Sequence, residues 1–337
     1  MERTSILIIA IVSLLVTGVL GFFMIPWLKR LKYGQTIKEI GPTWHKSKEG
    51  TPTMGGLMFI IGSVAGLAVG YISLVLEVPQ FLNVQYASEN VRLFAGLGAA
   101  LGFGAIGFAD DYMKVVHHRN LGLRARYKII FQVLVSAVYL YVMYAFGEMS
   151  TVLDFPFIGG VDLGVWFFVF SMLFIIFMVN AVNLTDGIDG LCSTVMFVAC
   201  LGFIVISSIL GYVGTTMLST AIAAGCIGFI IWNFFPAKVF MGDTGSMFLG
   251  GAFMAMAYGV SFPMLAMLCG IVFVCEGMSV VIQMTYFRLS HGKRLFKMTP
   301  IHHHFELCGF TEIKIVVTFG LVALFGSILA VGAAFIR

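Results

Sequence analysis

The stretch SILIIAIVSLLVTGVLGFFMIPW, residues 5–27, contains no charged residue and is followed closely by Lys29 and Arg30. A helix needs about 20 apolar residues to cross the hydrocarbon core of a bilayer, so this stretch is long enough to span a membrane. It has neither the basic leading segment nor the small-residue exit of a cleaved signal peptide. We therefore expect a retained membrane helix.

The composition extends this expectation to the whole chain. Of 337 residues, 60% are hydrophobic and 11% are charged, whereas about a quarter of the residues are charged in an ordinary soluble domain. This balance excludes a soluble enzyme, a fibrous protein, a disordered regulator and a nucleic-acid-binding protein. The six cysteines occur singly, so no disulfide framework is expected. A multi-pass membrane protein remains.

Apolar runs of spanning length recur along the chain and predict an all-α, polytopic membrane protein with about ten transmembrane helices. We treat residues 1–337 as a single transmembrane domain. The expected helices lie near residues 5–27, 54–76, 92–108, 129–146, 164–180, 191–211, 216–232, 247–261, 263–287 and 315–336.

The charges between these runs indicate an orientation. Five alternate loops, residues 28–53, 109–128, 181–190, 233–246 and 288–314, hold 17 of the 20 Lys and Arg residues and all 7 histidines. Because cytoplasmic loops carry the excess of positive residues, these five loops are predicted to be cytoplasmic and both termini to face outward. Functional chemistry is then expected on the cytoplasmic face.

Two adjacent carboxylates, Asp110 and Asp111, follow the third apolar run, with Lys114 close behind. Neighbouring carboxylates at a membrane boundary repel each other, and a divalent cation or a lysine would relieve that repulsion. A solvated interfacial pair is an equally good interpretation of these residues alone. The G-x-G-x-x-G pattern at residues 102–107 lies inside an apolar helix, so we attribute it to helix packing and not to a dinucleotide site.

The fifth run is followed by polar side chains at every third position. These are Asn180, Asn183, Asp186 and Asp189, and a helical turn would place their oxygens on one side. Gly187 and Gly190 would allow a ligand to approach the backbone closely. A polar capping turn is the alternative, but a loop with four oxygen-bearing side chains and no cation favours ligand binding.

Another candidate ligand, Asp243, stands at the start of the eighth run, after Asn233 and Phe240. A helix cap explains Asp243 by itself, whereas a role as ligand of a hard metal would suit the other aspartates. Phe240 is placed to stack on a base ring.

The last cytoplasmic loop contains His302, His303 and His304 among several cations. Neighbours on a helix point about 100° apart, so the three rings cannot share one direction. Without zinc spacing or paired cysteines, phosphate contact or proton transfer is favoured over zinc binding. Glu276 and Gln283 share one face of the ninth run, and an intramembrane carboxylate such as Glu276 is as compatible with a structural hydrogen bond as with a function.

Hard oxygen ligands, cations, glycine-rich helix starts and histidines on one membrane face are what metal-dependent phosphoryl transfer requires. The residues alone therefore predict an enzyme that joins a soluble phosphorylated donor to a lipid.

Five segments closely resemble the phospho-N-acetylmuramoyl-pentapeptide-transferase family, within the polyprenyl-phosphate N-acetylhexosamine-1-phosphate transferase superfamily. They are residues 48–56, 108–114, 180–190, 233–246 and 300–306. The resemblance implies transfer of phospho-MurNAc-pentapeptide from its UDP carrier to undecaprenyl phosphate, giving lipid I and UMP with Mg²⁺ at the bacterial cytoplasmic membrane. The expected partners also include the lipid bilayer but no nucleic acid, as the composition indicates. A homodimer is left open, and its interface could lie on any glycine-rich helix face.

Matching motif positions carry the family's functional residues to this chain. The resemblance implies catalytic roles for Asp110, Asp111, Asp243, His302, His303 and His304. It implies substrate binding by Lys48, Thr53, Lys114, Lys128, Asn183, Asp186, Asp189, Asn233, Phe240 and Gln283, and metal binding by Asp243 and Asn183.

Two other functions stay open at this point. One is a sister UDP-GlcNAc:polyprenyl-phosphate transferase, which the Pro300–Glu306 stretch argues against. The other is a transporter coupled through Glu276. A carrier would keep its binding groups near the bilayer midplane, whereas the polar groups of this chain gather on one face.

Overall fold

The computed structural model describes residues 2–30, 50–116 and 122–336 and shows a helical membrane protein. Within these ranges, nine helices are long and apolar enough to span a membrane, which confirms the predicted polytopic all-α class. Those nine are α1 (Glu2–Arg30), α2 (Gly56–Glu77), α3 (Ala87–Val116), α4 (Ala125–Phe146), α5 (Trp166–Thr185), α6 (Leu191–Leu210), α7 (Val213–Asn233), α10 (Ile271–Leu289) and α12 (Glu312–Ile336).

The remaining elements are short or fully enclosed. Helix α8 (Gly242–Gly259) is flanked in sequence by the loop after α7 and by the short helix α9 (Leu265–Cys269). The others are the short helix α11 (Ile301–Glu306), the 3₁₀ turns η2 (Pro79–Leu82) and η3 (Val84–Tyr86), and the strands β1 (Val152–Phe155) and β2 (Gly159–Asp162). The two strands pair antiparallel, with Val152 opposite Asp162. The sequence patterns had not indicated this hairpin.

The expected eighth span, residues 247–261, coincides with α8 except for its last two residues, and the residues of α8 from Thr244 to Gly259 are all buried. Helix α8 packs most extensively against α3 and also against α5 and α2. A helix enclosed by other helices does not need to face lipid, so glycine, alanine and methionine replace the branched aliphatic residues of its neighbours. Helix α8 therefore forms the core of the bundle. Its sequence is less apolar than those of the nine spans, and it is not among them.

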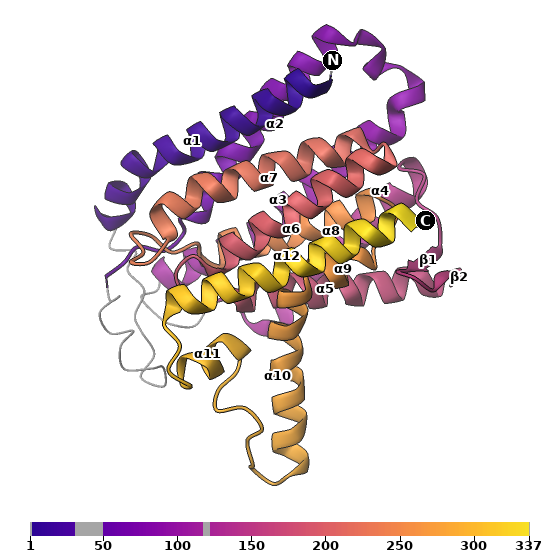
Figure 1. Cartoon of the computed structure of the whole chain (residues 1–337). Helices are drawn as coiled ribbons and strands as arrows, with labels where there is room; N and C mark the ends of the chain where they lie inside the picture. Colours follow the sequence, from indigo (N-terminus) through magenta and orange to yellow (C-terminus); the bar gives the residue numbers. More distant parts are fainter. Residues whose placement is uncertain (1, 31–49, 117–121, 337) are drawn as a thin grey trace.

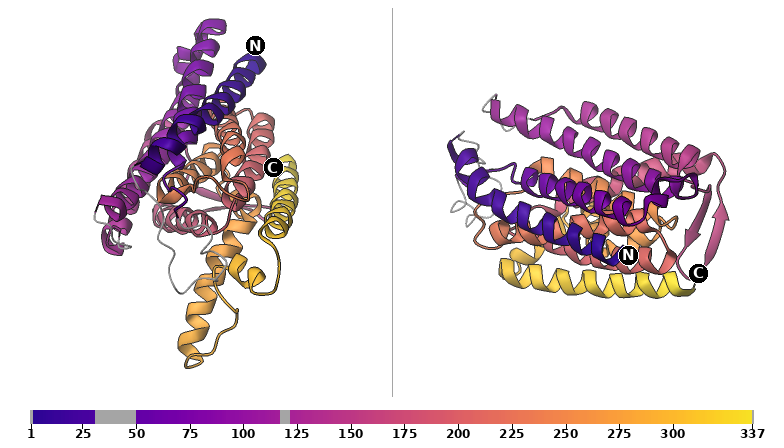
Figure 2. Two further views of the ribbon diagram at one scale, coloured as in Figure 1. Left: turned by 90° about the vertical axis from the view of Figure 1, so that its left-hand side faces the viewer. Right: turned by 90° about the horizontal axis from the view of Figure 1, so that it is seen from above.

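The expected ninth span, residues 263–287, was wrong as a continuous helix. It divides at Gly270 into α9 and α10. Glycine is the poorest helix former after proline, and Gly270 adopts a non-helical conformation with φ −101° and ψ 24°. After this break, α10 leaves the bundle at a steep angle to the other long helices (Figures 1 and 2).

Several helices extend beyond their predicted ends, and this places candidate residues on helices instead of in loops. Helix α3 continues past Asp111 to Val116, α4 already contains Lys128, and α5 continues past Asn180 to include Asn183. A helix can continue with polar side chains where these side chains reach water. The last turns of α3 and α5 therefore extend beyond the apolar runs that predicted them. The two chain ends lie at the same end of the bundle as the β hairpin (Figures 1 and 2).

Candidate active site

Three carboxylates from two helices form a cluster at the end of the bundle remote from the hairpin. Asp110 and Asp111 near the end of α3 and Asp243 in the first turn of α8 each offer an oxygen within 4.8 Å of the others. Asp110 and Asp111 are buried, whereas the side chain of Asp243 is 21% exposed. Residues 133 positions apart in sequence thus meet at one place.

The absence of a side chain at Gly107 allows this meeting. A Cβ atom on Gly107 would lie 2.1 Å from the carbonyl oxygen of Asp243 and 2.8 Å from the backbone nitrogen of Thr244. Only glycine permits the first turn of α8 to lie this close to α3. The last glycine of the G-x-G-x-x-G pattern therefore serves helix packing, in agreement with the sequence analysis.

Two lysines neutralise part of the negative charge. The Nζ of Lys114 lies 2.9 Å from Oδ2 of Asp243 and also forms an ion pair with Asp110. The Nζ of Lys128, on α4, lies 3.2 Å from the same oxygen of Asp243. Two cations next to three carboxylates leave a net negative site, to which a divalent cation would be attracted.

Each carboxylate is also held by neutral hydrogen-bond donors. Oδ2 of Asp111 accepts hydrogen bonds from the backbone nitrogen of Thr244 at 2.9 Å and from its hydroxyl at 2.7 Å. Oδ1 of Asp110 accepts a hydrogen bond from the backbone nitrogen of Leu123 at 2.9 Å. These contacts fix the directions in which the remaining oxygens point.

Asn183 orients the third carboxylate. Its Nδ2 donates to Oδ1 of Asp243 at 2.9 Å and to the hydroxyl of Ser246 at 2.8 Å. In this arrangement the hydrogen bond from Asn183 fixes the orientation of the Asp243 carboxylate, as residues that surround metal ligands do. Direct ligation by the Asn183 oxygen stays a prediction.

The surroundings of Asp243 and Asp186, two aspartates outside the nine spans, shift their pKa values in opposite directions. Burial raises the pKa of the Asp243 carboxyl, but a hydrogen bond with Asp110 and the charges of Lys128 and Lys114 outweigh burial and hold that pKa below its ordinary value. Burial, followed by the charges of Asp243 and Asp111, raises the pKa of the Asp186 carboxyl to about 8. Asp243 is thus ionised at neutral pH, as a metal ligand must be.

The donor set of the cluster fits a hard divalent cation. Carboxylate oxygens are the ligands that Mg²⁺ prefers, and Mg²⁺ sites typically combine one or two protein carboxylates with waters and substrate phosphates. Among the described residues, Asp110, Asp111 and Asp243 form the only group of three or more acidic, histidine or cysteine side chains with suitably close ligand atoms.

The segment before α2 lies against the segment before α8. The backbone nitrogen of Phe240 donates to the Pro52 carbonyl at 2.8 Å, and the backbone nitrogen of Gly55 donates to the Phe240 carbonyl at 2.8 Å. Thr53 lies beside Gly242, where a Cβ atom would be 2.8 Å from the Thr53 hydroxyl and 2.7 Å from Oδ2 of Asp111. Two predicted substrate-binding residues, Thr53 and Phe240, are therefore next to the carboxylate cluster. Lys48, predicted from the same motif, lies outside the described residues.

Two further candidates connect neighbouring loops. Oδ2 of Asp189 accepts a hydrogen bond from the backbone nitrogen of Ala237 at 2.9 Å. Asn233 is buried; its oxygen accepts from the backbone nitrogen of Gly190 at 3.2 Å, and its nitrogen donates to the Val239 carbonyl at 3.0 Å. These contacts give both residues a structural task, and substrate contact by either stays a prediction.

Gln283 has a comparable task on α10. Its side-chain oxygen accepts hydrogen bonds from the backbone nitrogens of Leu295 and Phe296, at 3.1 and 2.9 Å. It thereby holds the loop that follows α10. Its predicted contact with substrate is not tested by these bonds.

The three histidines of α11 point to different partners, as their spacing predicts. Nδ1 of His302 contacts the Glu276 carboxylate, and Nδ1 of His303 lies 2.6 Å from Oε2 of Glu306. Nδ1 of His304 accepts a hydrogen bond from the backbone nitrogen of Lys297 at 3.2 Å. The structure thus gives each ring its own environment, and their catalytic roles remain predictions.

Sequence reasoning did not select Thr244, Ser246 or Glu306 as parts of the site. Thr244 follows Asp243 in the first turn of α8 and Ser246 lies at the start of the next turn, where hydroxyl side chains commonly accept or donate hydrogen bonds, so their position was an available signal. Glu306 follows His303 by three residues, the spacing at which helical side chains meet.

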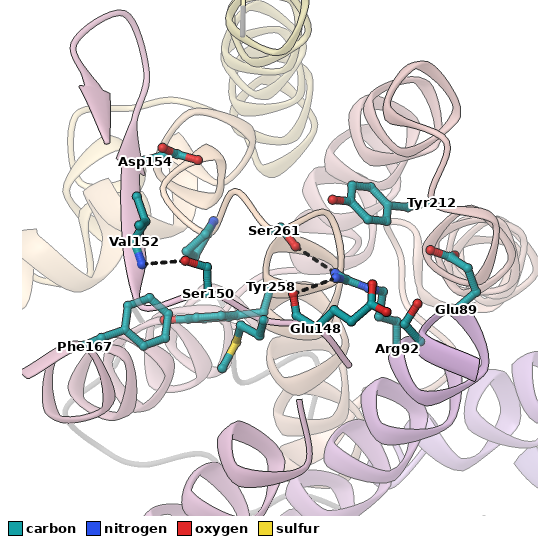
Figure 3. A pocket seen from close by; sticks show the side chains of 13 residues that line it. Glu89, Arg92, Glu148, Ser150, Val152, Asp154, Phe167, Tyr212, Tyr258 and Ser261 are labelled. Carbon is teal, nitrogen blue, oxygen red and sulfur yellow. Dashed lines mark hydrogen bonds between the residues drawn. The ribbon is translucent and has the colours of Figure 1, made fainter. Parts of the chain in front are cut away.

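A cavity of about 520 Å³ lies at the opposite end of the bundle (Figure 3). Its most buried charged residue, Arg92, precedes Asp110 by 18 residues on α3, about 27 Å along the helix axis. Nη1 of Arg92 donates to the Gly259 carbonyl and to the Ser261 hydroxyl, both at 2.8 Å, and the guanidinium lies over the Tyr212 ring. These contacts connect the start of α3 to the end of α8, so Arg92 has a structural role away from the carboxylate cluster.

Comparison with known proteins shows that the chain is similar to transferases. Residues 93–261 match the family described as Glycosyl transferase family 4, and residues 48–60 match phospho-N-acetylmuramoyl-pentapeptide-transferase signature 1. A protein of Desulforudis audaxviator named phospho-N-acetylmuramoyl-pentapeptide-transferase is 42% identical over 327 residues, covering 95% of both chains. Proteins of the same name are 42% identical in Listeria monocytogenes, covering 95% of both chains, and 44% identical in Desulforamulus reducens, covering 96% of this chain and 94% of that one.

Proposed function

The chain belongs to the phospho-N-acetylmuramoyl-pentapeptide-transferase family and is a membrane transferase, and from this membership we propose its substrates. The donor is UDP-MurNAc-pentapeptide, the acceptor is undecaprenyl phosphate, and the products are lipid I and UMP. The whole chain, residues 1–337, is taken as one catalytic domain. A coupled transporter does not fit a member of a transferase family.

The observation that carries the proposal is the carboxylate cluster of Asp110, Asp111 and Asp243 with Lys114 and Lys128 beside it. In the proposed reaction, an acceptor phosphate oxygen bonds to the sugar-bearing phosphorus of the donor. The bond from that phosphorus to the bridging oxygen breaks, and UMP leaves with that oxygen. The site must therefore hold phosphate oxygens and accept a proton from, or add to, a phosphate group.

The residues of the cluster can divide these tasks. Lys114 and Lys128 would exchange part of their pairing with Asp243 for contacts with the donor diphosphate. Asp110 or Asp111 would take the proton of the acceptor phosphate, or attack as a nucleophile in a two-step reaction. Both routes need an ionised carboxylate close to the transferring phosphorus.

We further propose Mg²⁺ as the cofactor, held by Asp243 with the help of the neighbouring carboxylates and Asn183. When bound, the cation would neutralise the diphosphate and stabilise the leaving UMP. Support comes from the all-oxygen donor set and from the ionised state of Asp243. The proposed location is the bacterial cytoplasmic membrane, with the carboxylate cluster on the cytoplasmic face, and a homodimer is compatible with this arrangement.

The test is a reconstitution with purified full-length protein in detergent. The protein is incubated with undecaprenyl phosphate, with or without Mg²⁺, and with either UDP-MurNAc-pentapeptide or UDP-GlcNAc. We expect UMP and lipid I from the first donor, and in the presence of Mg²⁺. Release of UMP with UDP-GlcNAc but not with UDP-MurNAc-pentapeptide would instead assign the sister GlcNAc-1-phosphate transferase activity.

A further inference from the structure

Two side-chain amides, those of Gln132 and Asn180, join α4 to α5 and have no part in the function proposed so far. Nδ2 of Asn180 donates to Oε1 of Gln132 at 2.9 Å, and Nε2 of Gln132 donates to Oδ1 of Asn180 at 3.3 Å. Nδ2 of Asn180 also donates to the Ile176 carbonyl of its own helix at 2.7 Å. In this amide pair, each side chain is thus both donor and acceptor to the other.

Gln132 is the first residue on the buried face of α4. The buried residues of this helix are Gln132, Ser136, Tyr139, Leu140 and Met143. Its neighbours Phe131 and Val133 are exposed apolar residues, as expected on a helix that borders lipid. Away from water, an amide without a hydrogen-bond partner is unfavourable, and hydrogen bonds between membrane helices hold those helices together. The amide pair therefore fixes α4 against α5 at this position.

The amide pair lies one helical turn from two contacts to Asp243. On α4, Lys128 precedes Gln132 by four residues, and on α5, Asn183 follows Asn180 by three. These spacings place side chains on the same face of a helix. The Nζ of Lys128 lies 3.2 Å from Oδ2 of Asp243, and Nδ2 of Asn183 donates to Oδ1 at 2.9 Å. The two helices thus contact the two oxygens of one carboxylate, and the amide pair sets the distance between these helices.

We propose that Gln132 is a positioning residue that acts through Lys128. Its bonds to Asn180 keep α4 at the distance from α5 at which the Lys128 ammonium group reaches Asp243 and, once the donor binds, the donor diphosphate. Gln132 is 0% exposed and one turn away, so it touches no substrate itself. The inference rests on the proposed nucleotide donor and adds to it the residue that holds one phosphate-binding lysine in place.

Exchanging the two amides provides a rescue. Gln132→Leu removes one member of the pair. Gln132→Asn shortens one side of the pair by a methylene group and Asn180→Gln lengthens the other side by the same amount, so the double variant restores the span. Ser136→Ala is the matched control, because Ser136 is buried one turn further along α4 and its hydroxyl donates to the Gln132 carbonyl within the same helix.

The first measurement is the kinetics of UMP release by the full-length protein with Mg²⁺. We expect Gln132→Leu to raise KM for UDP-MurNAc-pentapeptide by about 10-fold, because a charged hydrogen-bond donor is misplaced. A variant that merely folds less well would lower kcat and leave KM unchanged. The exchanged double variant should return KM close to the wild-type value, and Ser136→Ala should not change it. In a Lys128→Ala protein, Gln132→Leu should add little, since residues that act as a unit are not additive.

A second measurement does not depend on activity. Reductive methylation of the protein without substrate, read by mass spectrometry, compares Lys128 with the exposed Lys238. The Lys128 side chain is 18% exposed and paired with Asp243, so its methylation should be slow in the wild-type protein. It should become several-fold faster in Gln132→Leu and return to the wild-type rate in the exchanged double variant.

An unchanged KM in Gln132→Leu, an unchanged methylation rate of Lys128, or a double variant no better than Gln132→Asn would each overturn the positioning role. Failure of the proposed function would look different. The wild-type protein would then release no UMP from UDP-MurNAc-pentapeptide, while the difference in Lys128 methylation between wild type and Gln132→Leu would persist.

Discussion

At the scale of single residues, the three clustered carboxylates have different surroundings. Asp111 is fixed by two hydrogen bonds from Thr244, Asp110 by the backbone of Leu123, and Asp243 by Asn183 and two lysines. Asp243 is also the most exposed of the three. Asp243 is therefore the carboxylate best placed to receive a cation from water. Asp110 and Asp111 are buried, and their hydrogen bonds fix their orientation.

Replacing Asp243 tests this division of roles. Asp243→Asn keeps the shape but removes the charge that attracts Lys114, Lys128 and a cation. We expect UMP release to fall by more than about 100-fold, because a charged group that contacts the reacting phosphates is lost. Asp110→Asn and Asp111→Asn should also cripple turnover. Asp154→Asn at the hairpin is the control, and near-normal turnover in the three cluster variants would refute the site.

The raised pKa of Asp186 predicts a dependence of stability on pH. Its pKa of about 8 in the folded protein exceeds the ordinary 3.8, so the folded state keeps a proton that the unfolded chain has released. This stabilisation is complete below about pH 4 and is lost as the pH rises through about 8. Without Mg²⁺, the melting temperature should fall from pH 6 to pH 8.5.

Asp186→Asn stays neutral throughout this range. The decrease in its melting temperature between pH 6 and pH 8.5 should therefore be smaller than that of the wild-type protein. An equal decrease in both proteins would show that another group is responsible.

At the scale of elements, the site depends on how closely two helices approach. Helix α8 runs buried through the bundle and has its most extensive contacts with α3. Its first turn brings Asp243 to the end of α3, and Gly107 leaves the space for that turn. Spacing in the sequence could place each aspartate at a helix boundary, but it could not show that these two boundaries touch.

Glycines on α3 provide a matched test of this approach. A Cβ atom on Gly107 meets the α8 backbone, whereas a Cβ atom on Gly98 of the same helix meets nothing within 4 Å. Gly107→Ala should destabilise the protein by about 1–3 kcal/mol through overpacking and should lower UMP release by displacing Asp243. Gly98→Ala should be neutral or stabilising by up to about 1 kcal/mol. Denaturation and turnover of both variants check this, and equal behaviour would contradict it.

At the scale of the whole molecule, the two ends of the bundle are chemically distinct. The carboxylate cluster, the lysines and the histidines gather at one end, and the chain termini and the β hairpin at the other (Figure 1). The positive charge of the loops predicts that the first end is cytoplasmic. This orientation determines which compartment supplies a soluble donor.

Cysteine labelling in intact cells tests the orientation. With the exposed Cys275 and Cys308 changed to serine, the four remaining cysteines are buried, and one exposed cysteine is introduced by Ile158→Cys at the hairpin or by His291→Cys after α10. A maleimide that does not cross membranes should label the hairpin cysteine directly, and the other cysteine after the cells are made permeable. The reverse result would place the carboxylate cluster outside.

The sequence alone determined the membrane class, the approximate helices and the motifs, because apolar length and charge asymmetry act locally along the chain. It also placed the aspartates and the site lysines close to helix ends, although the histidines, expected in a loop, lie within the short helix α11. Its ninth span was wrong, since one residue, Gly270, breaks it. The tertiary structure decided the rest: the approach of α3 and α8 at Gly107, the burial of α8, and the pairing of Glu276 with His302. These are contacts between residues distant in the chain, and only close packing of the helices brings them together.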